Sequence, residues 1–199
     1  MQRGGVDSLK LAGEFFTRDD PVFKTLRSIS AKLEALGIPY AVAGGMTLVA
    51  HGYDRTTVGV DILVTPAGLA EIHRQLHGLG YVPPFAGSKN FRDATTKVRI
   101  EFLTTGAYPG DGKPKPVAFP DPKDSAIEID GIRFLRLEKL IELKLASGMT
   151  NAGRLKDLAD VQELIRALKL DRAFAEQLDL FVRPKYGELW DGLRSDQGA

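Results

Sequence analysis

Two acids interrupt apolar segments of this 199-residue sequence that are otherwise typical of buried strands. Asp61 lies in RTTVGVDILV, residues 55–64, and Glu101 lies in VRIEFL, residues 98–103. A buried carboxylate is costly unless it is ion-paired or binds a metal ion. Two such acids on two strands indicate one shared cation site. For either acid alone, a local ion pair such as that of Glu101 with Arg99 is the alternative.

The alternation of side chains along a strand fixes which residues share a face with each acid. Asp61 shares its face with Gly59 and Leu63, and Glu101 shares its face with Arg99. Alternate Cα atoms of a strand are ~6.6 Å apart, so an acid at position 59 would lie beside Asp61 and could bind divalent cations with it. Glycine is disfavoured in strands, which makes Gly59 conspicuous at this position.

A glycine pair precedes the first acidic strand. In VAGGMTLVAHG, a short strand ends at Gly44 and Gly45, and a short helix follows. Free backbone N–H groups at such a turn can bind phosphate, although a strand-to-helix turn also needs glycine for conformational reasons. The pair is neither a Walker loop nor a dinucleotide fingerprint. His51 and Arg55 flank the acidic strand, so they are candidates for nucleotide contacts, with packing at the helix end as the alternative.

The elements that must position these residues alternate between strands and helices and then become purely helical. This order predicts an α/β core, with a mixed sheet flanked by helices, followed by a C-terminal helical region. We expect an N-terminal extension at 1–20, the core at 21–135, and a helical region at 136–199 packed on the core. The expected elements are a helix capped by Asp20 and ended by Gly37, strands in 38–45, 57–64 and 96–106, a helix starting at Thr65–Pro66, a loop at 105–122, a hairpin around Asp130–Gly131, and helices at 136–147, 152–168, 171–179 and 184–195.

The predicted helix 136–147 carries one misplaced charge. At 100° per residue, Lys144 falls in the middle of an apolar arc, whereas Glu138, Lys139 and Glu142 lie opposite. A charge on a core-facing stripe needs a partner or a function.

The predicted helix 152–168 repeats this feature. Arg154 lies near the centre of its apolar arc and Asp157 lies inside it, whereas Asp160 lies outside. A structural ion pair, such as that of Lys144 with Asp157, and a long side chain that snorkels past the core edge are the alternatives to a functional role.

The composition excludes several classes of protein and site. Lys and Arg number 27 against 26 Asp and Glu, so no overall field attracts nucleic acid or membrane. The absence of cysteine excludes disulfides and thiolate metal sites. No apolar run reaches the length of a membrane span, and the N-terminal residues lack the pattern of a signal peptide. We therefore expect a cytoplasmic protein without a membrane partner.

The order of strand, glycine pair, short helix and acidic strands resembles the nucleotidyltransferase superfamily of the DNA polymerase beta type. More narrowly, the sequence is similar to small bacterial nucleotidyltransferases related to toxins of type IV toxin–antitoxin (abortive infection) systems. The matching segments are spread over most of the length of the chain. They are AVAGGMTLVAHGYDRTTVGVDILV, VRIEFL and LIELKLASGMTNAGRLKDLADVQELI.

This resemblance implies transfer of a nucleoside monophosphate from an NTP to an acceptor hydroxyl. In the family, an Asp-x-Asp pair and a third carboxylate hold two Mg²⁺ ions, which bind the triphosphate and activate the acceptor. Asp61 matches the second acid and Glu101 the third, and both are implied to be catalytic and metal-binding. Gly59 stands where the first acid belongs, which leaves the pair incomplete. Asp54 is near in sequence, but we expect it on the preceding loop.

The resemblance also implies a set of nucleotide contacts and partners. The implied nucleotide-binding residues are Gly44, Gly45, Thr47, His51, Arg55, Lys144, Arg154 and Asp157. The partners would be an NTP, an acceptor such as tRNA or protein that the sequence does not identify, and an antitoxin. Because Gly59 replaces an acid, the alternative is a decayed, non-catalytic protein that retains NTP or partner binding.

Overall fold

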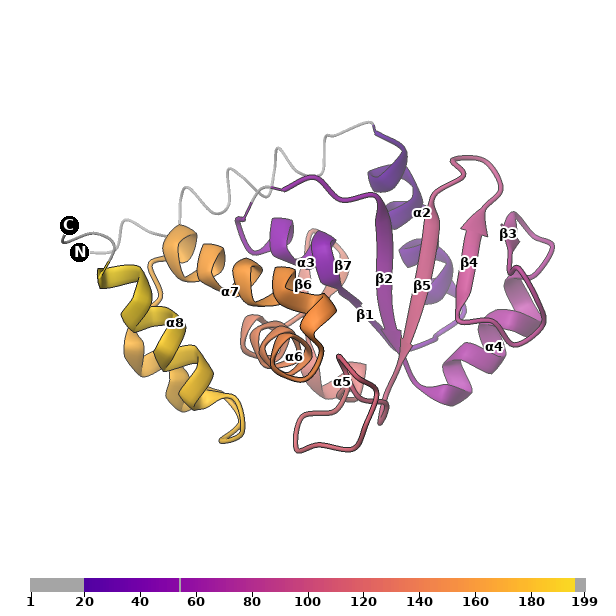
Figure 1. Ribbon diagram of the computed structural model, residues 1–199. Coiled ribbons are helices and arrows are strands. Elements are labelled where there is room, and N and C mark those ends of the chain that lie inside the picture. Colours follow the sequence, from indigo (N-terminus) through magenta and orange to yellow (C-terminus); the bar gives the residue numbers. More distant parts are fainter. Residues whose placement is uncertain (1–19, 54, 196–199) are drawn as a thin grey trace. The chain divides into compact units, whose positions relative to one another are not determined.

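The computed structural model describes residues 20–53 and 55–195, which form two compact units (Figure 1). The first unit comprises the described residues up to Thr105 together with Pro120–Leu135, and the second comprises Gly106–Phe119 and the residues from Arg136 onward. The expected core 21–135 therefore differs from the first unit by the loop 106–119. Asp54, and all of the expected N-terminal extension except Asp20, lie outside the described residues.

The first unit is built on a seven-stranded mixed sheet with the order β3-β4-β5-β2-β1-β7-β6. At its centre, β2 pairs in parallel with β5 and antiparallel with β1. The mixed sheet with flanking helices confirms the predicted α/β class. The strands are β1 (Tyr40–Ala43), β2 (Gly59–Val64), β3 (Tyr81–Val82), β4 (Asn90–Asp93), β5 (Arg99–Thr104), β6 (Ala126–Ile129) and β7 (Ile132–Leu135).

The two longer helices of this unit begin at the predicted caps. The Asp20 carboxylate accepts N–H bonds from Val22 and Phe23 at the start of α2 (Pro21–Ala35). The Thr65 hydroxyl accepts the Gly68 N–H at the start of α4 (Pro66–Leu76). Such caps satisfy backbone donors that lack partners within the helix. Two shorter helices are α3 (Gly44–Ala50) and α5 (Pro122–Ser125).

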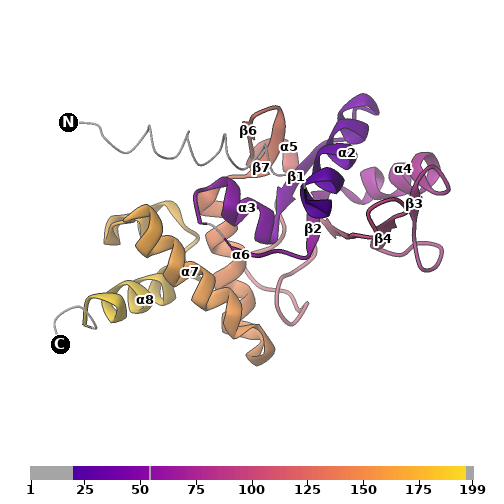
Figure 2. The same ribbon diagram turned by 90° about the horizontal axis from the view of Figure 1, so that it is seen from above.

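The main hydrophobic core lies between the sheet and helices α2 and α4, which lie on the same side of the strands in Figure 2. Every second residue of β2 and β5 faces this core, as strand alternation requires. The contributing side chains include Leu26, Ile29, Leu33, Val60, Ile62, Ile72, Phe91, Ile100 and Phe102. The intervening residues of β2 and β5, which include both acids, belong to the other face of the sheet.

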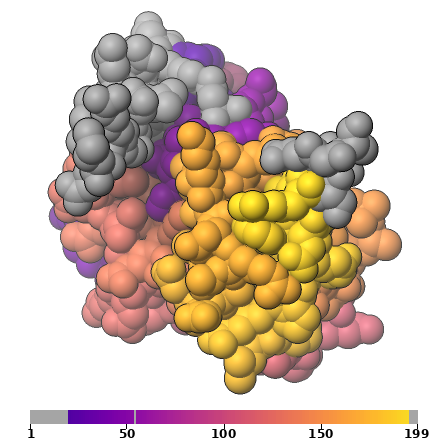
Figure 3. Space-filling model, turned by 90° about the vertical axis from the view of Figure 1, so that its left-hand side faces the viewer, coloured from indigo at the N-terminus to yellow at the C-terminus, as the bar shows by residue number. Residues whose placement is uncertain are grey.

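The second unit is helical. Helix α6 (Leu137–Thr150) packs on α7 (Leu155–Leu168), and α7 packs on α8 (Arg183–Ser195); Figure 3 shows the outer surface of α7 and α8 in orange and yellow. A short 3₁₀ helix, η1 (Ala152–Arg154), precedes α7. The segment expected as a helix at 171–179 contains a 3₁₀ helix instead, η2 (Arg172–Gln177). Within the described residues, no helix is both long enough and apolar enough to cross a membrane.

Candidate active site on strands β2 and β5

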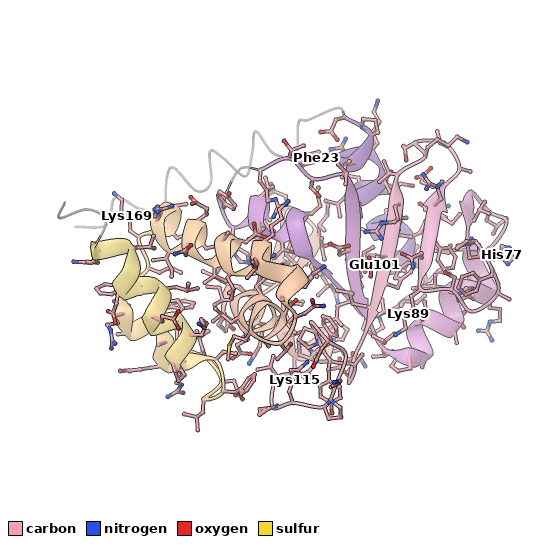
Figure 4. The ribbon with its side chains drawn as sticks, viewed as in Figure 1. Phe23, His77, Lys89, Glu101, Lys115 and Lys169 are labelled. Carbon is pink, nitrogen blue, oxygen red and sulfur yellow. The ribbon has the colours of Figure 1, made fainter. Side chains whose placement is uncertain are left out.

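Asp61 and Glu101 are directly paired in register across the parallel strands β2 and β5. Paired residues of neighbouring strands point to the same face, and the strands lie about 4.8 Å apart. This confirms that the two acids point to the same face of the sheet, whereas their sharing of one cation stays a prediction. Figure 4 shows Glu101 on β5 within the sheet.

Glu101 also has the local partner that the sequence offered as an alternative. Arg99 Nη1 lies 3.1 Å from Glu101 Oε2, and the two side chains are 55% and 35% exposed. Exposed pairs of this kind are worth about 0–1 kcal/mol. The Arg99 guanidinium can therefore move to another anion at little cost in stability.

The glycine turn packs directly against Asp61. Ala43 is the register partner of Asp61, and the next residue, Gly44, has a φ of +59°. A Cβ atom at Gly44 would lie 1.9 Å from Asp61 Oδ2, so the carboxylate occupies the space that any side chain there would need. A Cβ at Gly45 would lie 2.8 Å from the hydroxyl oxygen of Thr57. Both glycines therefore let the turn close over the acidic strand.

Gly59 leaves the set of acids incomplete. A Cβ atom there would lie 3.0 Å from the Arg99 carbonyl oxygen and 3.9 Å from Arg99 Cβ. Among residues 20–53 and 55–195, no group of three His, Cys, Asp or Glu side chains is placed to hold a metal ion. The pair of Asp61 and Glu101 fits one divalent cation, because carboxylate oxygens are preferred ligands of Mg²⁺. The two acids do not supply enough ligands for two such ions.

Thr47 and His51 use their side chains to hold α3 in place. The buried Thr47 hydroxyl donates to the Val42 carbonyl oxygen at 2.6 Å. His51 Nε2 lies 2.8 Å from the carbonyl oxygen of Leu135 on β7. For His51, these contacts agree with the alternative of packing at the helix end.

Arg55 lies in a different setting from Thr47 and His51. With Thr56 and Thr57, it lines a groove of about 500 Å³ whose other wall is the start of α2, residues 20–23. Since Thr57 also packs against Gly45, this groove reaches the edge of the glycine turn.

In the second unit, Lys144 is buried in an ion-pair network that joins α6 to α7. Its ammonium lies 3.0 Å from Asp157 Oδ1 and 2.7 Å from Asp160 Oδ2. Ser147 Oγ donates to Asp157 Oδ2 at 2.7 Å, and Arg154 Nε donates to the same oxygen at 2.9 Å. The structural ion pair of Lys144 with Asp157, which the sequence offered as the alternative to a functional role, is present. A nucleotide contact by Lys144, Arg154 or Asp157 stays a prediction.

The electrostatic balance at Asp157 favours its charged form. Burial alone would raise the pKa of the Asp157 carboxyl, but the Lys144 ammonium, the Ser147 hydroxyl and the Arg154 guanidinium together lower it below its usual value. The network therefore depends on charge as well as on packing.

The helical phase predicted from the sequence is wrong at several positions. Arg154 was expected near the centre of an apolar arc, but its side chain is 58% exposed. Asp160 and Glu142 were expected on outer faces, yet both are buried. Asp160 pairs with Lys144, while Glu142 accepts the Asp179 N–H and pairs with Lys139. The 3₁₀ turn at 152–154 removes Arg154 from the α7 phase, and the two acids are buried because partners compensate their charge.

Sequence reasoning missed two residues on the acidic face because it missed β4. Asn90 pairs in register with Glu101, and Arg92 pairs with Arg99. Asn90 Oδ1 is buried and has no hydrogen-bond partner within the described residues. The available signal was the apolar Phe91 between Asn90 and Arg92, and a four-residue strand with one apolar residue gives a weak pattern.

Among the comparisons with known proteins, the one with solved structures agrees with this architecture. Neither a family model nor a curated protein matches the chain. The crystal structure of ANT(2")-Ia in complex with adenylyl-2"-tobramycin is similar over 87% of this chain and 97% of its own, with 14% identity and a TM-score of 0.52. A putative nucleotidyltransferase from H. pylori aligns over 98% of this chain and 97% of its own, with 14% identity and a TM-score of 0.47. The protein thus has the nucleotidyltransferase fold.

Proposed function

We propose that this protein binds a nucleoside triphosphate with Mg²⁺ and transfers the nucleoside monophosphate to an acceptor hydroxyl, at a rate limited by Gly59. The observation that carries the proposal is the register pairing of Asp61 with Glu101 on one face of the sheet. The glycine turn that closes over Asp61 supports it, because the turn and the acids then belong to one site. The nucleotidyltransferase fold also supports it, because the sequence resemblance to that superfamily assigns a chemical role to these positions.

Asp61 and Glu101 would hold one Mg²⁺ ion between β2 and β5. When bound, the ion would supply positive charge to the triphosphate and to the charge that develops during phosphoryl transfer. Gly59 has no side chain that could bind a second ion. A water molecule could fill the empty coordination position, but it would not supply the negative charge of a carboxylate. This missing charge is the reason for the slow rate that we propose.

The protein's own residues would position the substrates and accept a proton. The acceptor oxygen forms a bond to the α-phosphorus, the bond from that phosphorus to the bridging oxygen of the β-phosphate breaks, and pyrophosphate leaves. Glu101, or Asp61 beside it, would accept the hydroxyl proton. The turn at Gly44 and Gly45 would hold phosphate oxygens through backbone N–H groups. Thr47 would keep that turn in place through its bond to β1.

For the acceptor, we propose only the reacting group, which is a hydroxyl. ANT(2")-Ia was crystallised with an adenylylated tobramycin, which is consistent with a hydroxyl acceptor on that fold. A tRNA or protein acceptor, and an antitoxin partner, stay predictions of the sequence resemblance.

A second candidate function is binding of an NTP without catalysis. Two observations favour it, the glycine at position 59 and the ion pair that Glu101 already makes with Arg99. This protein would then respond to the nucleotide and leave it intact. The two candidates predict the same nucleotide affinity and differ in label transfer.

The experiment that tests the proposal measures both properties on the full chain. ATP and GTP binding is titrated calorimetrically with and without Mg²⁺, and label transfer from α-³²P-NTPs to total cellular RNA and protein is followed. Asp61→Asn should abolish the Mg²⁺ dependence of binding and any transfer. Asp130→Asn, at the exposed tip of the β6–β7 hairpin, is the matched control and should change neither.

Equal Mg²⁺-dependent binding and transfer by Asp61→Asn and the unchanged chain would contradict the proposed site. Mg²⁺-dependent binding that Asp61→Asn abolishes, without transfer to any fraction, would favour the non-catalytic candidate.

A further inference from the structure

Arg99 lies directly opposite position 59, where the first acid of the pair is missing. Gly59 and Arg99 are register partners on β2 and β5, and a Cβ atom at position 59 would lie 3.9 Å from Arg99 Cβ. The Arg99 side chain is 55% exposed, and its guanidinium reaches Glu101 at 3.1 Å. A half-exposed positive charge thus lies next to the carboxylate pair, beside the strand position that lacks an acid.

Arg92 adds a second guanidinium directly opposite Arg99. The bonds from Phe102 N to the Lys89 carbonyl and from Asp93 N to the Val98 carbonyl mark the hydrogen-bonded pairs of strands β4 and β5. Pairs alternate along an antiparallel ladder, so the pair of Arg92 and Arg99 is a non-hydrogen-bonded one, whose Cα atoms are about 4.5 Å apart.

Like charges directly opposite each other destabilise a sheet. Arg92 is exposed, and the bond that its Nη1 donates ends on a neutral group, the Lys97 carbonyl oxygen. Glu101 pairs with Arg99, and this pair does not offset the charge of Arg92. A bound polyanion would offset both charges at once.

We propose that Arg99 and Arg92 bind the triphosphate chain of the nucleotide and replace the metal ion that a first acid would have held. This inference rests on the proposed function and names the phosphate-binding residues of the same site. An aspartate at position 59 with a divalent ion would bring a net charge of about +1 to this point, and a guanidinium brings the same charge without metal. Arginine also matches phosphate geometry through paired N–H donors.

The competing interpretation is an ordinary surface ion pair between Arg99 and Glu101 with no ligand. The two interpretations differ in one property, which is phosphate binding in the absence of metal. A surface pair predicts none, because the carboxylates would then repel a polyanion. Two arginines that replace a metal ion predict binding that survives chelation and weakens with salt.

The test is calorimetric titration of the full chain with inorganic tripolyphosphate and with ATP, in EDTA and in Mg²⁺. Arg99→Gln should lower the affinity for tripolyphosphate in EDTA at least about tenfold, the effect of losing one charge-assisted hydrogen bond. Arg92→Gln should lower it by a smaller factor, and Arg99→Lys should retain part of it. Arg74→Gln is the matched control, since Arg74 is an exposed arginine paired with Glu71 on α4, and it should change nothing.

Gly59→Asp provides a second, independent readout. The new carboxylate would lie beside Arg99 and pair with it, so tripolyphosphate affinity in EDTA should fall while the Mg²⁺ dependence of ATP binding rises. The inference is overturned if the unchanged chain binds no tripolyphosphate in EDTA, or if Arg99→Gln binds it as well as the unchanged chain does. If the binding results hold but no variant transfers label, the phosphate site stands and the proposed catalysis fails.

Discussion

Lys144 lies buried between two carboxylates of α7, at 3.0 Å from Asp157 and 2.7 Å from Asp160. Lys144→Met would leave both acids without their shared cation. Breaking a buried pair by removing one partner typically costs ~3–5 kcal/mol, and we expect this loss in the free energy of unfolding in urea. Lys185→Met is the control, because Lys185 makes a more exposed pair with Glu188 and should cost less than about 1 kcal/mol. Equal stability of both variants would contradict a structural role for the network.

The lowered pKa of Asp157 predicts how this network responds to acid. A carboxyl whose pKa is lower in the folded than in the unfolded protein stabilises the fold above its unfolded pKa, and this contribution is lost as pH falls through the folded pKa. For Asp157 the loss should begin near its ordinary value of 3.8 and continue below it. The stability difference between the unchanged chain and Asp157→Asn should therefore shrink below pH 4 in urea titrations. A difference that stays constant from pH 7 to pH 3 would contradict the pKa shift.

At the scale of residues, sequence patterns predicted which charges are unusual better than they predicted where each one lies. Alternation along the strands placed Asp61 and Glu101 on one face, and the structure pairs them in register. The helical phase correctly brought Lys144 to Asp157, but it placed Asp160 and Glu142 on outer faces. Asp160 is buried against Lys144, and Glu142 accepts the Asp179 N–H in addition to its pair with Lys139. The contacts with Lys144 and Asp179 are distant in sequence, so no local pattern contains them.

At the scale of elements, the glycine pair that begins α3 directly after β1 packs against the candidate site. Gly44→Ala would place a Cβ atom 1.9 Å from the present position of Asp61 Oδ2 and would strain a backbone with a φ of +59°. We expect it to displace the Asp61 carboxylate and lower Mg²⁺-dependent ATP affinity at least about tenfold, the loss of one hydrogen bond to a charged group.

Gly78→Ala is the matched control for this turn. Gly78 has a similar φ of +82°, with nothing within 4 Å of its would-be Cβ. It should show the cost of backbone strain in thermal unfolding and leave ATP affinity unchanged. Equal ATP affinities for Gly44→Ala and Gly78→Ala would show that the turn does not support the site.

Elements with strong local signals were predicted correctly, and elements without them were not. Asp20–Pro21 and Thr65–Pro66 start helices where expected, and the Asp130–Gly131 turn forms the β6–β7 hairpin. Strands β3 and β4 have two and four residues. They pair with each other, and β4 pairs with β5, so each is defined by its neighbours more than by its own short pattern. The 3₁₀ helix at Arg172–Gln177 differs from an α-helix by one residue in its hydrogen-bond spacing, which composition alone cannot specify.

At the scale of the whole molecule, the loop Gly106–Phe119 belongs to the helical unit although its flanking residues belong to the sheet unit. Its Gly110 carbonyl accepts a bond from Asn151 Nδ2, and a Cβ at Gly110 would lie 2.4 Å from Thr150 Oγ1. Gly110→Ala should therefore detach the loop and raise hydrogen exchange across 106–119. Gly112→Ala, with a φ of +73° and nothing within 4 Å of its Cβ, should not. Unchanged exchange in Gly110→Ala would contradict this anchoring.

Because the whole chain is almost neutral, phosphate binding would depend on individual side chains near the site. The formal net charge is +1 at pH 7, so no long-range field draws a nucleotide to the protein. The proposed nucleotide affinity depends instead on a few groups around β2 and β5, namely Asp61, Glu101, Arg99 and Arg92. Single substitutions in this set should accordingly have large effects on binding and small effects on folding.

The measurement that tests the central claim most directly is the rate of Mg²⁺-dependent label transfer by Gly59→Asp. Gly59→Ala is the control, because a Cβ atom at this position already approaches the Arg99 carbonyl oxygen at 3.0 Å and alanine isolates that steric effect. One preorganised electrostatic contact is typically worth about a hundred- to a thousand-fold in rate. We predict that Gly59→Asp transfers label faster than both the unchanged chain and Gly59→Ala by a factor of this order, and that adding Asp61→Asn removes the gain. A Gly59→Asp protein that binds NTP but transfers label no faster than Gly59→Ala would contradict the placement of the active site on β2 and β5.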